Sequence, residues 1–421
     1  MKILYLYMFP LWGNGSAAFL RELTGEIVKR GHTVAIIAPD KRKLPGIKHY
    51  VVEPPQMGVF VGHPELPRAK RFEDMNGKEL GYIYASYLKA TIDAVSEFDP
   101  EIIHVFHTAF LPGIARLIKI LFGIKFIITT HGSDLNYLSS DNRFIGLIND
   151  ANRVARFITA NSDFTKRWYL DMFGDDLRRK SSVIMGGVNL SNYKRDPGEI
   201  TFINKKYNLF NKKVVLFTGR LTENKGVIYL VRAAASINGT VLIVGDGSER
   251  KHLEHEIKKR RLRNVVLAGY INPTNLRFFH AFYERADVYI SSSVWEEPLG
   301  LTILEAMAAH APVVATRKGG VVSLIKNGVN GFFIRPRNSK QIAETINMLL
   351  ENDALRKKIA DEAYNTVRER FTWDKIADQF EAIYKQFRYS TSEYIARVKG
   401  TSPQLSGIIG SINQFFARNG S

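Results

Sequence analysis

The chain of 421 residues contains no cysteine, which excludes a disulfide framework, a thiol nucleophile and a thiolate metal site. No run of 18 apolar residues occurs, so the sequence predicts no transmembrane helix. The first residues, MKILYLYMFP, begin a strand pattern and lack the basic segment, long apolar stretch and cleavage site of a signal peptide. We therefore expect a cytoplasmic protein, with peripheral contact at the inner face of the membrane left open.

Acidic residues are scarce relative to basic ones, with 41 Asp and Glu against 59 Lys and Arg and a formal net charge of +18. Residues 1–195 carry +7 of this excess and the remainder carries +11, so the charge is spread over both halves. Such a balance suits an anionic partner, which could be a nucleotide, a nucleic acid or an anionic membrane. A basic surface that serves only solubility would explain it equally well.

Short apolar runs alternate with segments of helical periodicity along most of the chain, and this alternation predicts α/β domains with parallel sheets covered by helices on both faces. The length predicts two domains of roughly 200 residues. We expect an N-terminal domain (1–190), an irregular, polar linker (191–211), a C-terminal domain (212–371), a further helix (372–388) and a C-terminal tail (389–421). An apolar stripe in the tail, Leu405 to Phe416, suits a docked helix or, alternatively, a helix lying on a membrane surface.

The segment Ser291–Arg335 contains the densest pattern. A strand expected at Asp287–Ser293 ends in the loop Glu296-Glu297-Pro298-Leu299-Gly300, and a helix is expected to follow at Leu301–Ala309. Open α/β sheets bind ligands where a strand runs through such a loop into a helix, and the free N–H groups at the helix start favour a phosphate. Glu297 and Glu305 are eight positions apart, which alone would also suit two solvated carboxylates.

The complete string E-x-x-G-L-x-x-x-E-A-M-A, then P-V-V-A-T, G-G and N-G-x-x-G, resembles the C-terminal signature of glycosyltransferase family 4, and the resemblance extends over nearly all of residues 1–390. Members of this glycogen synthase-like and sucrose-phosphate synthase-like superfamily are retaining enzymes of the GT-B fold. The resemblance implies two doubly wound Rossmann-like domains facing a cleft, with the helix Thr372–Phe387 crossing back to the N-terminal domain. It also implies transfer of a hexosyl group from a nucleoside-diphosphate sugar to a hydroxyl acceptor such as a glycan, a glycolipid or a small sugar.

A second motif, Gly219-Arg220-Leu221-x-x-x-Lys225-Gly226, follows a strand expected at Val214–Phe217. As a bare pattern it could be a surface turn, but it matches the diphosphate-binding motif of the family. The sequence has no D-x-D pair and no histidine cluster with metal-ligand spacing, so we expect protein cations rather than a metal to stabilise the leaving diphosphate. We expect no cofactor.

The resemblance assigns roles to individual positions. The expected catalytic residues are His131, in an H-G-x-D loop, Glu297, facing the donor sugar, and Arg220 and Lys225, which hold the diphosphate. The remaining expected donor-binding residues are Glu305 at the ribose, Gly300 with the N–H groups of Leu301 and Thr302 at the diphosphate, Gly269 and Ile271 at the base, and the glycine loop at Gly13 and Gly15.

Several positions leave alternatives open. Gly13-x-Gly15-x-x-Ala18 followed by Asp40 also fits a dinucleotide-binding fingerprint. His104 and His107 are expected to be structural. Ser323 stands where the family often has an acidic residue, and Asn189 ends a segment that often ends in aspartate, so the sugar and the acceptor cannot be assigned by analogy.

The partners we expect are a nucleotide sugar and a hydroxyl acceptor, without nucleic acid, and a homo-oligomer stays open. The competing functions are other GT-B sugar chemistry, such as that of a phosphorylase or an epimerase, and a non-catalytic basic protein that binds nucleic acid or membrane.

Overall fold

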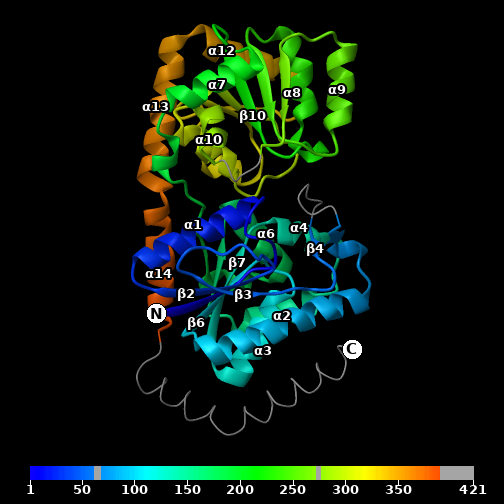
Figure 1. Ribbon diagram of the computed structural model, residues 1–421, viewed down its shortest axis with the longest axis vertical. Helices are drawn as coiled ribbons and strands as arrows, with labels where there is room; N and C mark the ends of the chain where they lie inside the picture. Colours follow the sequence, from blue (N-terminus) through cyan, green and yellow to red (C-terminus); the bar gives the residue numbers. More distant parts are fainter. Residues whose placement is uncertain (61–67, 272–275, 389–421) are drawn as a thin grey trace. The chain divides into compact units, whose positions relative to one another are not determined.

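The computed structural model describes residues 1–60, 68–271 and 276–388, and these form two compact units (Figure 1). Unit 1 comprises Met1–Asn161, Thr165–Ile184 and the chain from Ala377 onward, whereas unit 2 comprises Ser162–Phe164 and Met185–Ile376. Among the described residues, no helix is long and apolar enough to cross a membrane.

Unit 1 contains a seven-stranded parallel sheet in the order β3-β2-β1-β6-β7-β8-β9. Its central strands are short aliphatic runs whose residues are buried on both faces, as expected when helices cover both sides of a parallel sheet. The strands are β1 (Lys2–Leu6), β2 (Thr33–Ala38), β3 (Lys48–Val51), β6 (Ile102–Phe106), β7 (Lys125–Thr130), β8 (Phe157–Ala160) and β9 (Ser181–Val183). The helices are α1 (Gly15–Lys29), α2 (Gly77–Phe98), α3 (Leu111–Phe122), α4 (Ser133–Ser140), α5 (Ile145–Val154) and α6 (Asp163–Phe173), and a small pair of strands, β4 (Gly58–Val59) and β5 (Lys70–Arg71), lies apart from the main sheet.

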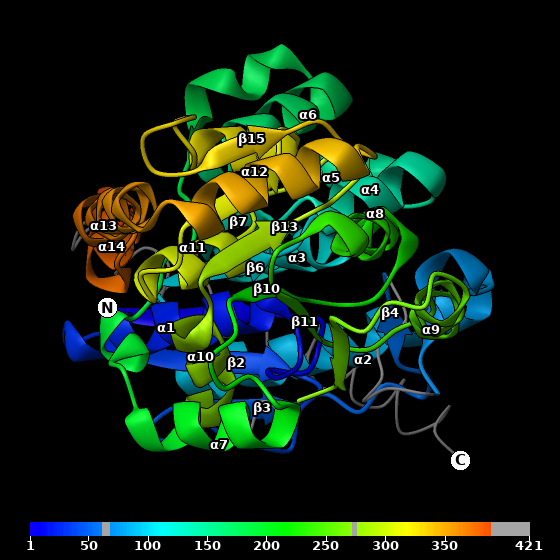
Figure 2. The same ribbon diagram turned by 90° about the horizontal axis from the view of Figure 1, so that it is seen from above.

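Unit 2 contains a six-stranded parallel sheet in the order β12-β11-β10-β13-β14-β15 (Figure 2). Its strands are β10 (Val214–Thr218), β11 (Thr240–Val244), β12 (Val265–Gly269), β13 (Val288–Ser291), β14 (Val313–Thr316) and β15 (Phe332–Ile334). Its helices are α7 (Pro197–Tyr207), α8 (Val227–Ala233), α9 (Arg250–Lys259), α10 (Leu276–Arg285), α11 (Leu301–Ala308), α12 (Ser339–Glu351) and α13 (Asp353–Arg370). Two buried aliphatic clusters, one on each face of the sheet, form its core.

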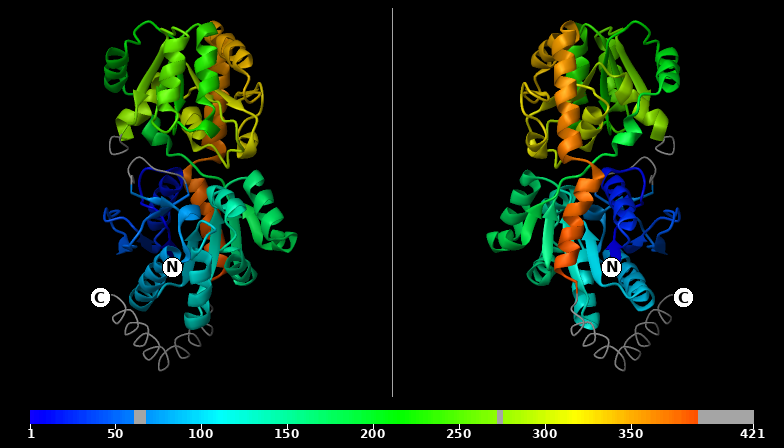
Figure 3. Two further views of the ribbon diagram at one scale, coloured as in Figure 1. Left: turned by 90° about the vertical axis from the view of Figure 1, so that its right-hand side faces the viewer. Right: turned by 90° about the vertical axis from the view of Figure 1, so that its left-hand side faces the viewer.

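Helix α14 (Trp373–Gln386) starts in unit 2 and contributes its residues from Ala377 onward to unit 1, so the prediction of a helix that crosses back is confirmed. Polar contacts hold it there: His32 Nε2 lies 2.9 Å from Glu381, and Arg30 pairs with Asp378 at 2.9 Å. Figure 3 shows this part of α14 along the helices and strands of unit 1.

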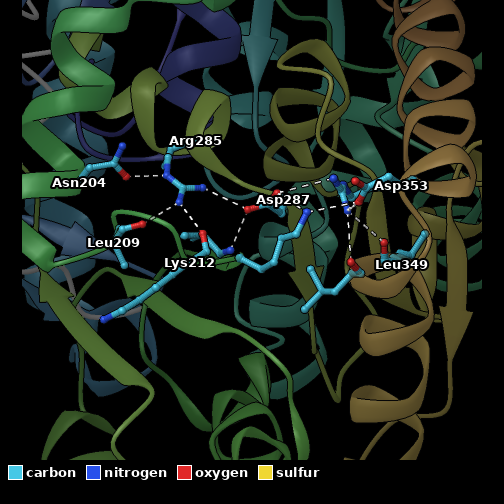
Figure 4. Close-up of polar contacts among 11 residues, drawn as sticks. Asn204, Leu209, Lys212, Arg285, Asp287, Leu349 and Asp353 are labelled. Atoms are coloured by element: carbon cyan, nitrogen blue, oxygen red, sulfur yellow. Dashed lines mark hydrogen bonds and ion pairs between the residues drawn. The ribbon is translucent and has the colours of Figure 1, made fainter.

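A polar network holds the segment between α7 and β10 against the amino-terminal edge of the sheet in unit 2 (Figure 4). Arg285 donates to the carbonyl oxygens of Leu209 (3.0 Å) and Lys212 (2.7 Å) and to Asn204 in α7 (2.6 Å), and it pairs with Asp287 at 3.1 Å. These contacts satisfy carbonyl groups at an irregular turn, so we assign Arg285 a structural role.

The expectation of an irregular linker at 191–211 is wrong, because these residues include α7 and lie in unit 2. Asp196 caps α7 by accepting from the N–H groups of Gly198 and Glu199, and Pro197 occupies the first helical position. This pairing is a recognised helix-start signal. The predicted boundary at residue 190 therefore falls inside unit 2, and the apolar stripe of the tail lies outside the described residues.

Candidate active site

The carboxyl-terminal edge of the sheet in unit 2 brings together the four charged residues expected at the donor. The chain runs from β10 outward to β11 and β12, then returns to place β13 on the other side of β10. Such a reversal opens a crevice at the carboxyl ends of the two central strands, where doubly wound sheets bind ligands. Arg220 and Lys225 follow β10, while Glu297 and Glu305 follow β13.

Lys225 and Glu297 form an ion pair at this crevice. The side chain of Glu297 is buried, and Ser293 Oγ donates to Glu297 Oε1 at 2.9 Å. Burial alone would raise the pKa of Glu297, but Lys225 and Ser293 outweigh it and hold the pKa below its usual range. Glu297 is therefore an ionised hydrogen-bond acceptor at neutral pH.

Arg220 is the second cation at the crevice, and its side chain is exposed. No hydrogen bond or ion pair joins it to another described residue, although it interacts electrostatically with Glu297. A guanidinium offers five N–H donors in a fixed fork, so Arg220 is free to bind a phosphate group.

Glu305 lies one turn into α11 and is held by a tyrosine that sequence analysis did not identify. Tyr283 of α10, which is fully buried, donates its hydroxyl proton to Glu305 Oε2 at 2.5 Å, and the same hydroxyl lies 2.7 Å from Thr218 Oγ1. Burial raises the pKa of Glu305 to about 7, although the Tyr283 hydrogen bond opposes the rise. Near pH 7 Glu305 is therefore divided between its neutral and ionised forms.

Close backbone packing fixes the loop that carries Glu297. The N–H of Gly320 donates to the carbonyl of Glu297 at 2.6 Å, and a Cβ at Gly320 would lie 2.1 Å from the carbonyl oxygen of Pro298. Only glycine fits so close to a neighbouring carbonyl group, and this explains why the chain has glycine at Gly319 and Gly320. Two serines that sequence analysis also missed lie between the end of β13 and the Lys225 loop. Ser292 Oγ donates to the carbonyl of Lys225 (3.1 Å), and Ser293 Oγ lies 2.9 Å from the carbonyl oxygen of Asn224.

Helix α11 begins after Gly300, whose backbone is left-handed (φ 94°), and no side chain caps it. The N–H groups of Leu301 and Thr302 belong to its first turn, where no earlier turn of the helix supplies acceptors. They are therefore available to an anion, and the helix dipole favours negative charge there.

The segment expected to seat the base, Gly269 to Ile271, follows β12. The N–H of Gly245 donates to the carbonyl of Gly269 at 2.9 Å, and the N–H of Leu221 donates to that of Asp246 at 2.9 Å. A Cβ at Gly245 would lie 1.9 Å from the carbonyl oxygen of Gly219. The Gly245-Asp246-Gly247 pattern is thus explained by packing between neighbouring loops.

In unit 1 the glycine loop at Gly13 and Gly15 leads into α1. Asn14 caps this helix by accepting from the N–H of Ala17 at 2.8 Å. Asp40 accepts from the backbone N–H groups of Leu11 (3.1 Å) and Arg42 (2.8 Å). Asp40, the acidic residue of the possible dinucleotide-binding fingerprint, therefore stabilises the loop through its carboxylate.

His131 follows the last residue of β7, and Asp134 orders its loop. The fully buried Asp134 carboxylate accepts from the N–H groups of Thr108 (2.6 Å), His131 (3.2 Å), Gly132 (2.7 Å) and Leu135 (3.1 Å). These bonds satisfy a buried charge and fix the backbone of His131. Sequence analysis did not assign Asp134 this role, although the H-G-x-D motif contains it.

His107, at the end of β6, lies beside His131, with ring centroids 4.7 Å apart. Burial lowers the pKa of each imidazole to about 3, so both are neutral at working pH. His131 Nε2 is buried and has no partner among the described residues. His104 is different, because its two ring nitrogens meet Tyr384 (2.7 Å) and Thr129 (2.6 Å) in the core.

Within the described part of the chain, no group of three or more histidine, aspartate or glutamate side chains is arranged to hold a metal ion. The predicted residues thus form two sets. One set, on unit 2, consists of Arg220, Lys225, Glu297, Glu305 and the start of α11. The other, on unit 1, consists of the glycine loop and His131.

Solved structures with the same architecture define the fold class. Anabaena HepE, solved in complex with UDP and glucose, matches with a TM-score of 0.72 and 22% identity, covering 92% of this chain and all of that chain. Sucrose-phosphate synthase from Thermosynechococcus elongatus matches with a TM-score of 0.75 and 19% identity, covering 91% and 98%. The protein therefore has the GT-B fold, with two Rossmann-like α/β domains.

Sequence comparison relates most of the chain to known glycosyltransferases. Residues 13–192 match the family model described as Glycosyltransferase Family 4, and residues 199–366 match Glycosyl transferases group 1. An uncharacterized glycosyltransferase of Methanocaldococcus jannaschii is 28% identical over 393 residues, covering 88% of this chain and 94% of the relative. The protein is therefore a glycosyltransferase, and it is similar to family 4 over its N-terminal part and to group 1 over its C-terminal part.

Proposed function

We propose that the protein transfers a hexosyl group from a nucleoside-diphosphate sugar to a hydroxyl acceptor, with retention of anomeric configuration and without a metal ion. The observation that carries this proposal is the pair of cations, Arg220 and Lys225, beside the two carboxylates Glu297 and Glu305 at the reversal point of unit 2. Cations in this position can take the place of a divalent metal at the diphosphate.

Donor binding would rearrange the contacts among these residues. The diphosphate competes for the ammonium group of Lys225 and adds the guanidinium of Arg220 and the N–H groups of Leu301 and Thr302. Glu297, released from the ion pair, then accepts hydrogen bonds from hydroxyls of the donor sugar. Glu305 binds the ribose hydroxyls in its ionised form.

In the proposed reaction the bond between the anomeric carbon and the diphosphate oxygen breaks, and the acceptor oxygen bonds to the same face of that carbon. The departing phosphate oxygen takes the acceptor proton, so that charge and protons balance. The low pKa of Glu297 suits a hydrogen-bond acceptor better than a base. His131, which is neutral, positions a sugar hydroxyl through its unpartnered nitrogen.

The donor we propose first is a UDP-hexose, because the GT-B protein HepE was solved with UDP and glucose. The acceptor we propose is a glycan, a glycolipid or a small sugar, and peripheral contact with an anionic membrane would bring the enzyme to a lipid-linked one.

The test is a thermal-shift screen of UDP-, GDP- and ADP-hexoses, followed by proton NMR of the sugar released from the stabilising donor in excess EDTA. A ligand at about 100 times its Kd stabilises a protein by about 2.7 kcal/mol, which is easily detected. For an α-linked donor we expect the α-anomer to appear first, and we expect the Lys225→Ala variant to release sugar roughly 10²–10³ times more slowly. Initial release of the β-anomer, or loss of activity in EDTA with recovery on adding magnesium or manganese, would contradict the proposal.

A further inference from the structure

Positive charge is concentrated on α9 and the turn that follows it. Residues 250–263 contain seven lysines or arginines and two glutamates, a net +5 in 14 residues. Glu256 is buried and pairs with Arg232 and Arg260. The other acidic residue, Glu254, pairs with Arg250 at 2.9 Å.

Three of the five cations that remain lie around a hollow of about 540 Å³ with an aliphatic lining, which we name the α9 groove. Lys258, Arg261 and Arg263 line it and are exposed, and no ion pair joins them to other described residues. Glu254 also lines it, but this carboxylate is paired with Arg250. The aliphatic lining consists of Ile257, Leu262, Val265 and Leu267. All four are only half-buried, because β12 is an edge strand with a neighbour on one side only.

Arg261 has a left-handed backbone (φ 54°) just after the end of α9. Glycine is the usual residue at such a position, because a side chain is strained there. Arg261 therefore places a cation at the rim of the groove, although its backbone conformation favours glycine.

The position of the groove separates it from the donor site. Val265 begins β12, so the groove lies toward the amino-terminal end of that strand. The donor residues follow the carboxyl-terminal ends of the strands in the same parallel sheet. The free cations of the groove therefore do not serve the diphosphate.

We propose that the α9 groove docks the enzyme on an anionic phospholipid surface. Lys258, Arg261 and Arg263 bind headgroup phosphates, and the aliphatic lining receives the apolar part of the lipid. The groove contains no aromatic side chain on which a nucleobase could stack, which favours lipid over nucleic acid. The proposal is independent of the donor chemistry described above.

The test compares sedimentation of the full-length protein with phosphatidylcholine vesicles and with vesicles that also contain phosphatidylglycerol. We expect binding only to the anionic vesicles, weakening with added salt. The triple variant Lys258→Gln/Arg261→Gln/Arg263→Gln should bind about 100-fold more weakly, since each cation at an anionic surface contributes about fivefold. The control Lys205→Gln/Lys357→Gln/Lys358→Gln removes the same charge from exposed, unpaired positions elsewhere on unit 2, and it should lose less than fivefold.

Arg261→Gly gives a second readout, because it relieves the strained backbone. Its melting temperature should match or exceed that of the wild type while its vesicle binding falls. Donor hydrolysis in solution should be unchanged in every variant. Equal losses in the triple variant and its control, no vesicle binding by the wild type, or tighter binding to single-stranded RNA that the triple variant abolishes, would each overturn the proposal.

Discussion

Replacing Tyr283 with phenylalanine isolates the hydrogen bond that poises Glu305. The substitution removes one hydroxyl from a fully buried ring and leaves the ring packing intact. The hydroxyl lowers the pKa of Glu305, which burial raises to about 7. A hydrogen bond to an ionised group contributes about 1.5–3 kcal/mol, which corresponds to a rise of roughly 1–2 in the pKa of Glu305.

The change should appear in the pH dependence of the KM for the donor. At pH 7 Glu305 is about half ionised in the wild type, but only about 1–10% ionised when its pKa rises by 1–2. If the ionised form binds the ribose, the KM at pH 7 should rise about 5- to 50-fold, and the difference should close above about pH 9.5. The kcat should change little, because the ribose contacts are the same in the ground and transition states.

Tyr289→Phe is the matched control. Tyr289 is also buried and its hydroxyl lies 3.2 Å from Thr218 Oγ1, but it makes no hydrogen bond to Glu305. Its KM–pH profile should follow that of the wild type. Superimposable profiles for wild type and Tyr283→Phe, measured by steady-state kinetics from pH 5.5 to 9.5, would refute the role assigned to Tyr283.

Three further outcomes follow from the geometry. Glu305→Gln should stabilise the fold by about 3 kcal/mol at pH 8 and by little below pH 4.5. The pKa of Glu305 is higher in the folded protein than the unfolded value of 4.5, so the wild type loses stability as the pH rises toward 7. Denaturant unfolding at both pH values measures the difference, and a difference that does not depend on pH would contradict the prediction. Asp134→Asn should destabilise unit 1 by about 3 kcal/mol, because an amide cannot accept from all the N–H groups around it. A melting temperature within 2 °C of the wild type, on the order of 0.5 kcal/mol, would exclude such a loss of stability. The pH profile of activity should contain no ionisation of His131 between pH 5 and 8, because the pKa of His131 lies near 3. An ionisation in that range that is present in the wild type and absent from His131→Gln would contradict this prediction.

The sequence was sufficient to predict most strands of the two main sheets and the loops that carry the proposed charged residues, because local signals encode them. The aliphatic run at β10 followed by the Arg220 motif predicts both the strand and its loop within one residue. The hydrogen bond between Tyr283 and Glu305 was not predictable, since it joins residues of two different helices through tertiary packing. Helix α7 was missed although Asp196 and Pro197 mark its start, because its polar composition resembled that of a linker.

The most direct test of the central claim is the effect of Arg220→Ala and Lys225→Ala on kcat with one saturating nucleotide sugar. In the proposed reaction these cations stabilise the diphosphate as the sugar departs. Loss of such a stabiliser typically costs about 3–4 kcal/mol, or roughly 10²–10³ in kcat. Arg220 is exposed and unpaired among the described residues, so the melting temperature of Arg220→Ala should change little. Lys225→Ala leaves the buried Glu297 carboxylate without its ion-pair partner, so its melting temperature should fall, and its kcat is measured at a temperature where it is fully folded. We therefore predict a kcat reduced by that factor in each folded variant. A kcat within about twofold of the wild type in both well-folded variants, which corresponds to less than about 0.5 kcal/mol, would contradict the account.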